Sequence, residues 1–146
     1  MAITFPDNTE DTIDAIREAI GRDVTFVTVS AIACTASGCG LDPVTNTGTN
    51  SFCVTCSGLY WIPVLSNSTV KAHVTWGNAE ELNWVTGGQL INGDCRIQVK
   101  STSAILSTLE DTDHVIVDGK TFEIKSKIYR GVPEINRVLI DLIEKE

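Results

Sequence analysis

The sequence lacks the features that mark membrane-spanning and nucleic-acid-binding proteins. No stretch approaches the ~18 consecutive apolar residues that a membrane helix needs, although 42% of the 146 residues are hydrophobic. Only 11 residues are lysine or arginine, against 19 aspartate or glutamate, which gives a net charge of −8. Tight binding to phosphate backbones uses clustered basic residues, and this balance opposes it. The composition is globular, and the length predicts a single domain over residues 1–146.

Residues typical of catalytic sites are also few. The chain has two histidines, His73 in a β-type segment and His114 before a hairpin, and neither belongs to a recognisable Ser/His/Asp arrangement. The pair Gly87-Gly88 does not open a helix and lacks the Lys-Ser/Thr ending of a phosphate-binding loop. We therefore expect no catalytic residues and no enzymatic activity.

Cysteine, in contrast, is concentrated in one segment. Four of the five cysteines fall within 23 residues, spaced as C-x4-C, thirteen residues, then C-x2-C: Cys34, Cys39, Cys53 and Cys56. Two close pairs with a loop between them are the layout of a tetrahedral zinc site built from two knuckles. Four thiolates close the coordination shell, so we predict a structural zinc ion and a zinc-ribbon-like insertion over residues 33–58.

Two disulfides, or four plain thiols, are the alternatives to zinc. Secreted disulfide scaffolds are usually short and open with a signal peptide, whereas residues 1–7 show neither a basic flank nor an apolar run. We expect thiols made in a reducing cytosol to bind metal. Gly40 and Gly58 follow the two pairs, where the chain is expected to turn tightly. The fifth cysteine, Cys95, is expected to be a small buried residue of a strand.

The remaining pattern is mainly β. A helix is predicted over residues 8–21, with Ile13, Ile16 and Ile20 packed on the core and Arg17 facing away. Strands are predicted from residue 23 to 29, at 59–64 and at 69–76. The segment 136–143 reads as a strand, with an amphipathic helix over 134–145 as its alternative.

Two hairpins are marked by turn dipeptides that suit a type I′ turn, Asn92-Gly93 and Asp118-Gly119. One N-terminal helix and about seven short strands predict a mainly β fold. We expect a small antiparallel β-barrel, or a sandwich, that carries the cysteine insertion. The tryptophans Trp61, Trp76 and Trp84 would form either a stacking platform for single-stranded nucleic acid or packing contacts, and the scarcity of nearby basic residues favours packing.

The order of several short segments resembles that of the head-closure proteins of tailed bacteriophages, which are the neck or stopper proteins between portal and tail. These segments are IGRDVT at 20–25, CVTCSG at 53–58, NGD at 92–94, DGKTFEI at 118–124 and GVPEINRV at 131–138. The most similar part is residues 89–143. Many members of that family lack the cysteines, so the insertion is an addition to the shared fold.

The resemblance implies a virion protein that is made in the host cytoplasm and that assembles into a homo-oligomeric ring, most often a hexamer. Such a ring joins the portal and adaptor proteins to the tail terminator and helps retain packaged DNA, which passes through the channel without sequence-specific binding. It implies no catalysis and no membrane. The candidates for loops that line or gate the channel are residues 40–51, 77–89 and 101–113.

Three other interpretations remain open. A zinc-ribbon module that binds nucleic acid would show a basic face, which the charge of −8 opposes. A small metalloenzyme would need an open coordination position. A tail-terminator or adaptor protein of the same neck is not separated from a head-closure protein by sequence.

Overall fold

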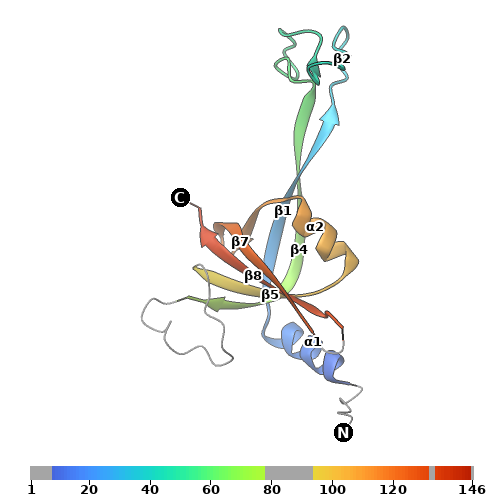
Figure 1. Cartoon of the computed structure of the whole chain (residues 1–146). Helices are drawn as coiled ribbons and strands as arrows, with labels where there is room; N and C mark the ends of the chain where they lie inside the picture. Colours follow the sequence, from blue (N-terminus) through green and yellow to red (C-terminus); the bar gives the residue numbers. More distant parts are fainter. Residues whose placement is uncertain (1–7, 78–93, 132–133, 146) are drawn as a thin grey trace.

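The computed structural model describes residues 8–77, 94–131 and 134–145 (Figure 1). Six antiparallel strands close into a barrel in the order β1-β4-β5-β8-β7-β6, which confirms the predicted mainly β fold and barrel. A two-stranded sheet, β2-β3, lies apart from it. The elements are α1 (Thr9–Ile20), β1 (Arg22–Ala33), β2 (Leu41–Asp42), β3 (Thr47–Gly48), β4 (Trp61–Trp76), β5 (Cys95–Lys100), α2 (Ser103–Glu110), β6 (Thr112–Val117), β7 (Lys120–Arg130) and β8 (Arg137–Glu144).

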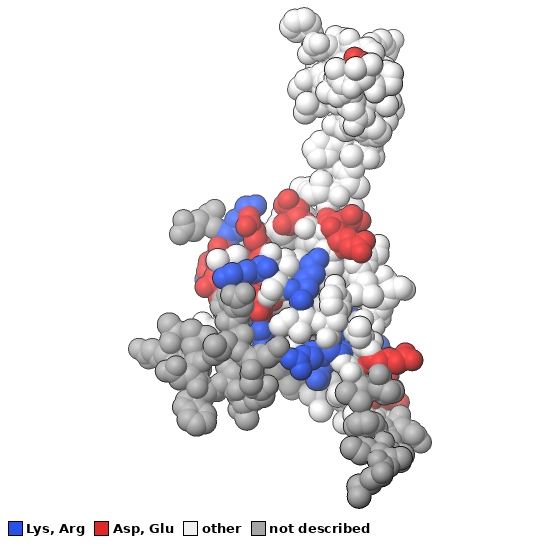
Figure 2. All heavy atoms as spheres, viewed as in Figure 1, with Lys and Arg blue, Asp and Glu red and all other residues white. Residues whose placement is uncertain are grey.

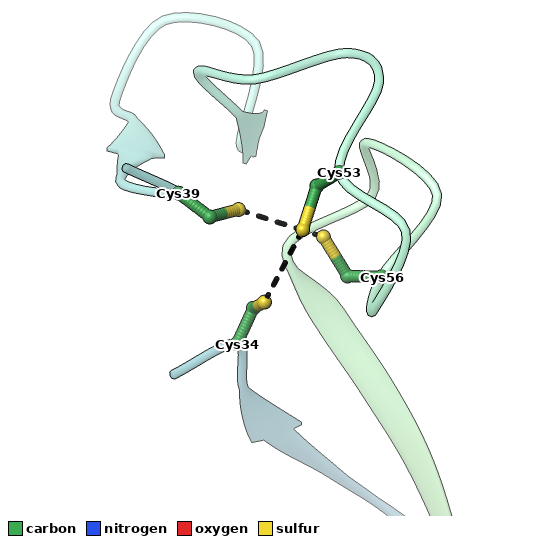
Figure 3. Close-up of side chains that lie close together, drawn as sticks. All are labelled: Cys34, Cys39, Cys53 and Cys56. Atoms are coloured by element: carbon green, nitrogen blue, oxygen red, sulfur yellow. Dashed lines mark hydrogen bonds between the residues drawn. The ribbon is translucent and has the colours of Figure 1, made fainter. Parts of the chain in front are cut away.

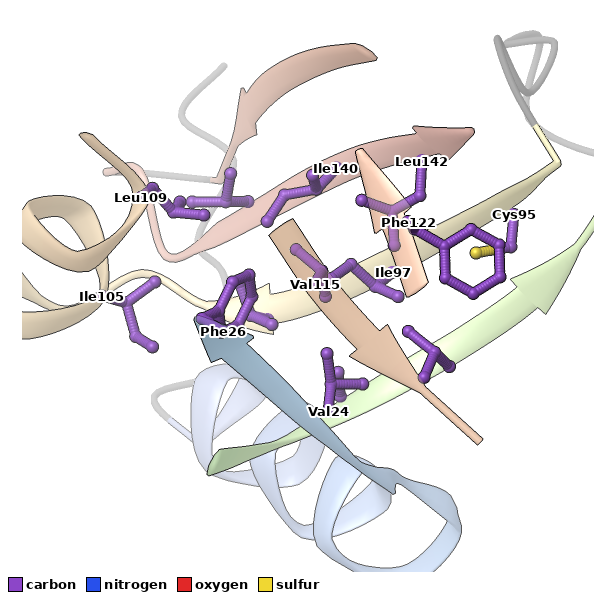
Figure 4. Close-up of a cluster of buried hydrophobic side chains, with 14 residues drawn as sticks. Val24, Phe26, Cys95, Ile97, Ile105, Leu109, Val115, Phe122, Ile140 and Leu142 are labelled. Atoms are coloured by element: carbon purple, nitrogen blue, oxygen red, sulfur yellow. The ribbon is translucent and has the colours of Figure 1, made fainter. Parts of the chain in front are cut away.

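Alternating side chains from all six strands fill the barrel interior (Figure 4). In β5, for example, Cys95, Ile97 and Val99 are buried while the residues between them are partly exposed, as the two-residue period of a strand requires. The buried cluster consists of Val24, Phe26, Ala72, Cys95, Ile97, Val99, Ile105, Leu109, Val115, Val117, Phe122, Val138, Ile140 and Leu142. The interior of the barrel is therefore a packed hydrophobic core.

The Asp118-Gly119 hairpin is confirmed. Val117 pairs with Lys120 across the turn, and the φ angles of Asp118 and Gly119 are 49° and 80°. Both central residues thus take the left-handed conformation that a type I′ turn needs. The predicted Asn92-Gly93 turn lies outside the described residues.

Strand β4 is one continuous strand, whereas two strands at 59–64 and 69–76 were predicted. The polar residues between those segments do not break it because each of them pairs with β1. The β1–β4 ladder runs through twelve residue pairs, from Arg22↔Ala72 to Ala33↔Trp61. The half of the ladder that begins at Arg22↔Ala72 belongs to the barrel. The half that ends at Ala33↔Trp61 projects from it as a two-stranded stem (Figure 1).

A register shift marks the point where the stem leaves the barrel. β1 pairs with β6 up to Thr28, and the pairing shifts between Val27 and Thr28. The Val29 amide still donates to the carbonyl oxygen of Asp111. Beyond Val29, β1 pairs only with β4 among the described strands. Residues 29–65, which comprise the stem and the cysteine-bearing tip, are called the arm below.

Helix α1 begins and ends as predicted, but the face it buries is different. Arg17 is only 6% exposed, while Ile16 and Ile20 are 53% and 59% exposed. Arg17 binds Asp14 at 2.6 Å, and Lys100 of β5 also pairs with Asp14. The helix thus contacts the barrel through its charged side, which leaves its isoleucine side open.

Helix α2 falls in the segment 101–113 that was expected to be a loop. The Thr102 hydroxyl accepts a hydrogen bond from the Ile105 amide and caps the first turn. Ile105 and Leu109, four residues apart, enter the barrel cluster.

The segment 137–144 is strand β8, so the helical alternative for this region is wrong. Within the described residues, neither helix combines the length and apolar character that crossing a membrane requires.

One buried ion pair joins β5 and β8 on the barrel. Asp141 is 1% exposed and accepts hydrogen bonds from Arg96 Nε at 2.5 Å and Arg96 Nη2 at 2.9 Å. The Ser126 hydroxyl donates to the same carboxylate at 3.0 Å. A register shift of β7 between Ile124 and Ser126 sets Ser126 opposite Asp141.

Replacing Asp141 with alanine is expected to destabilise the protein by about 3–5 kcal/mol, because it removes the carboxylate that balances the charge of the largely buried Arg96 guanidinium. Chemical denaturation followed by circular dichroism measures this loss. Glu123→Gln is the control, since the exposed Glu123–Lys145 pair at 3.2 Å is expected to contribute about 0–1 kcal/mol. Equal small effects of both changes would contradict this role for the buried pair.

Acid is expected to weaken the attachment of α1. Burial alone would raise the pKa of Asp14, but hydrogen bonds from Lys100 and Arg17 outweigh it and hold the pKa below the usual 3.8. This contribution to stability is present above pH 3.8 and is lost as the pH falls through the lower folded-state pKa. Unfolding free energies between pH 5 and pH 3 should therefore fall less steeply for Asp14→Asn than for the unmodified protein. Parallel curves for the two proteins would contradict this.

Candidate metal centre

The four predicted cysteines lie together at the end of the arm (Figure 3). Cys34 follows the last residue of β1, and its amide donates to the Tyr60 carbonyl oxygen at 2.8 Å, which extends the ladder by one step. Cys39 precedes β2, and Cys53 and Cys56 lie in the turns between β3 and β4. The ladder therefore fixes the position of Cys34, and the turns place the other three thiols close to it.

The sulfur atoms are close enough to hold one metal ion. All four lie within 4.8 Å of one another, with Cys34 and Cys53 at 3.8 Å and Cys39 and Cys56 at 3.5 Å. A tetrahedral ion with metal–sulfur bonds of ~2.3 Å needs sulfur–sulfur distances of about 3.8 Å. All five cysteines are free thiols, so the alternative of two disulfides is not what this structure shows.

The cluster is shielded from solvent. Cys34, Cys53 and Cys56 are 5–6% exposed, and Cys39 is partly buried. The neighbouring apolar residues are few: Ala36, Tyr60 and Ile62. The tip thus has a small core in which sulfur is the main component.

Tight turns set the thiol positions, and one of them is not where it was predicted. Gly58 has a φ of 80°, as expected, and a Cβ there would lie 2.9 Å from the Ser51 carbonyl oxygen. The left-handed glycine of the first pair is Gly38, with a φ of 78°, and not Gly40. Gly40 instead exchanges hydrogen bonds with Thr49, donating to its hydroxyl at 3.0 Å.

Sequence reasoning missed Gly48, which lies against the cluster. A Cβ on Gly48 would approach Cys39 Sγ to 3.3 Å and the Gly58 carbonyl oxygen to 3.0 Å. The Gly48 amide donates to that same carbonyl oxygen at 2.8 Å. Cysteine spacing carries no signal for this position, because the close approach arises only when β3 folds back over the tip.

The thiols differ in how readily they ionise. The amides of Cys56 and then Thr55 hydrogen-bond to the Cys53 sulfur and lower the pKa of that thiol to about 6. Burial, followed by the neighbouring Cys56 thiol, raises the pKa of Cys39 to about 12. One thiolate therefore forms readily at neutral pH, whereas further negative charge in the cluster needs a bound cation to offset it.

The other candidate residues do not join this site. Cys95 is fully buried in the barrel, where burial raises its pKa to about 12, as expected of an unreactive core thiol. His73 is exposed on β4, and His114 lies beside Asp113 at 2.8 Å. Trp61 and Trp76 occupy opposite ends of β4, so they do not share a stacking platform; Trp84 lies outside the described residues.

A further feature that sequence reasoning missed is the almost complete absence of charge from the arm. Asp42 is the only charged residue among residues 29–65, and all 11 lysines and arginines lie elsewhere in the chain. Figure 2 shows the arm as nearly uniformly uncharged above a body covered with charges of both signs. The signal is visible in the sequence as a long interval free of lysine, arginine and glutamate.

Comparisons with protein-family models, with curated proteins and with solved structures find no match to this chain. The geometry of the cysteine cluster, the arm and the barrel therefore carries the functional argument.

The cluster is expected to bind about one metal ion per chain. Cys56→Ser should lose that ion, because three thiolates and a hydroxyl bind less tightly, and hydrogen exchange should rise within residues 34–60 more than in the barrel. Elemental analysis and hydrogen-exchange mass spectrometry measure the two effects. Cys95→Ala is the matched control and should keep the metal. A metal-free protein with two oxidised cysteine pairs would contradict the assignment.

Proposed function

We propose that the metal is zinc and that its role is structural. Four sulfur ligands in a tetrahedral arrangement suit zinc or iron, and zinc imposes no geometric preference of its own and no redox chemistry. Four thiolates fill the coordination shell, so the residues present do not provide an open position for a substrate or a reactive water. The ion would stabilise a tip whose own apolar contacts are few.

We propose further that the protein is a structural component of the neck of a tailed bacteriophage, a ring-forming stopper or head-closure protein. The observation that carries this proposal is a small closed barrel with a packed interior from which an arm tipped by four clustered cysteines projects. Such a shape suits a part that joins other parts, since the barrel offers a rigid base and the arm reaches beyond it. The sequence resemblance over residues 89–143 supports the same role, which includes contacts with portal, adaptor and tail-terminator proteins and retention of packaged DNA.

The competing zinc-ribbon module for nucleic acid finds no support in the arm. A tip that gripped phosphates would carry lysine and arginine, and residues 29–65 contain neither. The cysteine tip is better suited to contact with uncharged protein surfaces.

Mixing the purified protein with a portal–adaptor complex tests the proposed function. The expected result is co-elution in size-exclusion chromatography as a ring on that complex, with labelled protein found at the neck of intact particles by electron microscopy. No association at any concentration would contradict the proposal. A control titration with a fluorescent oligonucleotide at low salt should show no binding, and strong salt-dependent binding would favour the nucleic-acid module instead.

A further inference from the structure

We propose that the tip of the arm of one copy binds the open isoleucine side of α1 on a second copy of this chain. The inference rests on the proposed ring-forming function and names the two surfaces that would join its subunits. It is carried by an apolar tip, an apolar groove and the distribution of charge between them.

The tip presents large apolar side chains to solvent on a rigid support. Phe52 and Val54 are 92% and 97% exposed, and they flank Cys53, a member of the metal-binding cluster. The Phe52 amide donates to the Asn50 side chain at 3.1 Å, and Val44, on the neighbouring turn, is 90% exposed. Because hydrogen bonds in the turns already order the backbone of these residues, their burial in an interface would cost mainly side-chain conformational entropy.

The groove lies on α1, at the opposite end of the molecule. It is lined by Ile13, Ile16, Arg17 and Ile20 of the helix together with His73 and Gln98 of the barrel, and it has a volume of about 230 Å³. Ile16 and Ile20 remain more than half exposed because Arg17 occupies the buried side of the helix. The groove is therefore an apolar surface with room for side chains of another molecule.

Charge selects which part of a second copy can enter this groove. Asp14 is paired with Arg17 and Lys100, but Glu10, Asp11 and Glu18 leave the exposed part of the helix acidic, so an acidic surface brought against it would be repelled. All acidic residues except Asp42 lie outside the arm, which makes the body of every copy acidic and the arm nearly neutral. The nearly uncharged arm can therefore approach α1 without like-charge repulsion, whereas the acidic parts of the body cannot.

The positions of the two surfaces require a second copy. The tip and α1 lie at opposite ends of the molecule, so one chain cannot bring its own tip to its own groove (Figure 1). A contact between two different patches is heterologous, and repeating it produces a ring when the rotation closes and a filament when it does not. The tip and the groove of every copy are both buried only when the contact repeats from copy to copy in a closed ring.

Sedimentation velocity over protein concentrations up to ~1 mM tests this contact, because that range detects self-association with dissociation constants as weak as about 1 mM. The unmodified protein should self-associate. Val54→Asp, at the tip, and Ile16→Asp, in the groove, should each weaken self-association at least about tenfold, as loss of a central contact does. Ala15→Asp, an exposed residue on the other side of α1, is the matched control and should have no effect.

Mixing the two defective variants makes the test specific. The Ile16→Asp protein retains an intact tip and the Val54→Asp protein retains an intact groove, so the mixture should form a one-to-one complex that cannot extend further. Circular dichroism and metal content should be unchanged in each variant, since both residues are exposed.

A monomeric unmodified protein at every concentration, or a mixture that forms no complex, would overturn the inference. Self-association that neither variant changes would also overturn it, because the copies would then join through other surfaces. That last result leaves the proposed ring intact. Conversely, head-to-tail association without any binding to a portal–adaptor complex would support the inference and contradict the neck function.

Discussion

The antiparallel ladder between β1 and β4 is the constraint on which the rest of the structure depends. Its twelve residue pairs join two neighbouring strands of the barrel. The same two strands continue in the same register as the stem of the arm. The final pair, Ala33 with Trp61, fixes the two chain segments that enter and leave the cysteine tip. A one-residue slip would turn the buried Val24 and Phe26 to the outside of the barrel, so the core of the barrel sets the register of the arm. The cysteine cluster is therefore positioned by packing that lies at the other end of the same two strands.

Features set by residues close together in the sequence could be predicted, whereas features set by contacts between distant residues could not. The Asp118-Gly119 turn and the spacing of the cysteines report backbone geometry and ligand chemistry within a few residues, and both were found from the sequence. The buried face of α1 could not be predicted, because the hydrophobic period shows which residues share a side but not that Lys100, far along the chain, would draw the charged side inward. Helix α2 is short, and the contacts that stabilise it, through Ile105 and Leu109, exist only inside the closed barrel.

The barrel and the tip of the arm have cores of different chemical composition. The barrel buries aliphatic and aromatic side chains and gains the hydrophobic effect, whereas the tip buries mainly sulfur and would gain the free energy of coordination from a bound metal ion. This division explains why the arm tolerates so many exposed apolar side chains: they are not required for its own folding, and they remain available to other surfaces. It also explains the composition of the arm, since threonine, serine, asparagine and glycine form turns around an ion more easily than they form a hydrophobic core.

The length of the tip has a consequence for the order in which the chain assembles. A hairpin closed by a two-residue turn brings its strands together at little entropic cost, but β1 and β4 are separated by residues 34–60. Closing a loop of that length costs about 2 kcal/mol more than closing a two-residue turn. An ion bound by Cys34, Cys53 and Cys56 would shorten the effective loop before the strands meet. The ion would then accelerate folding of a barrel that it never touches, and the cellular supply of metal would set how quickly newly made chains fold.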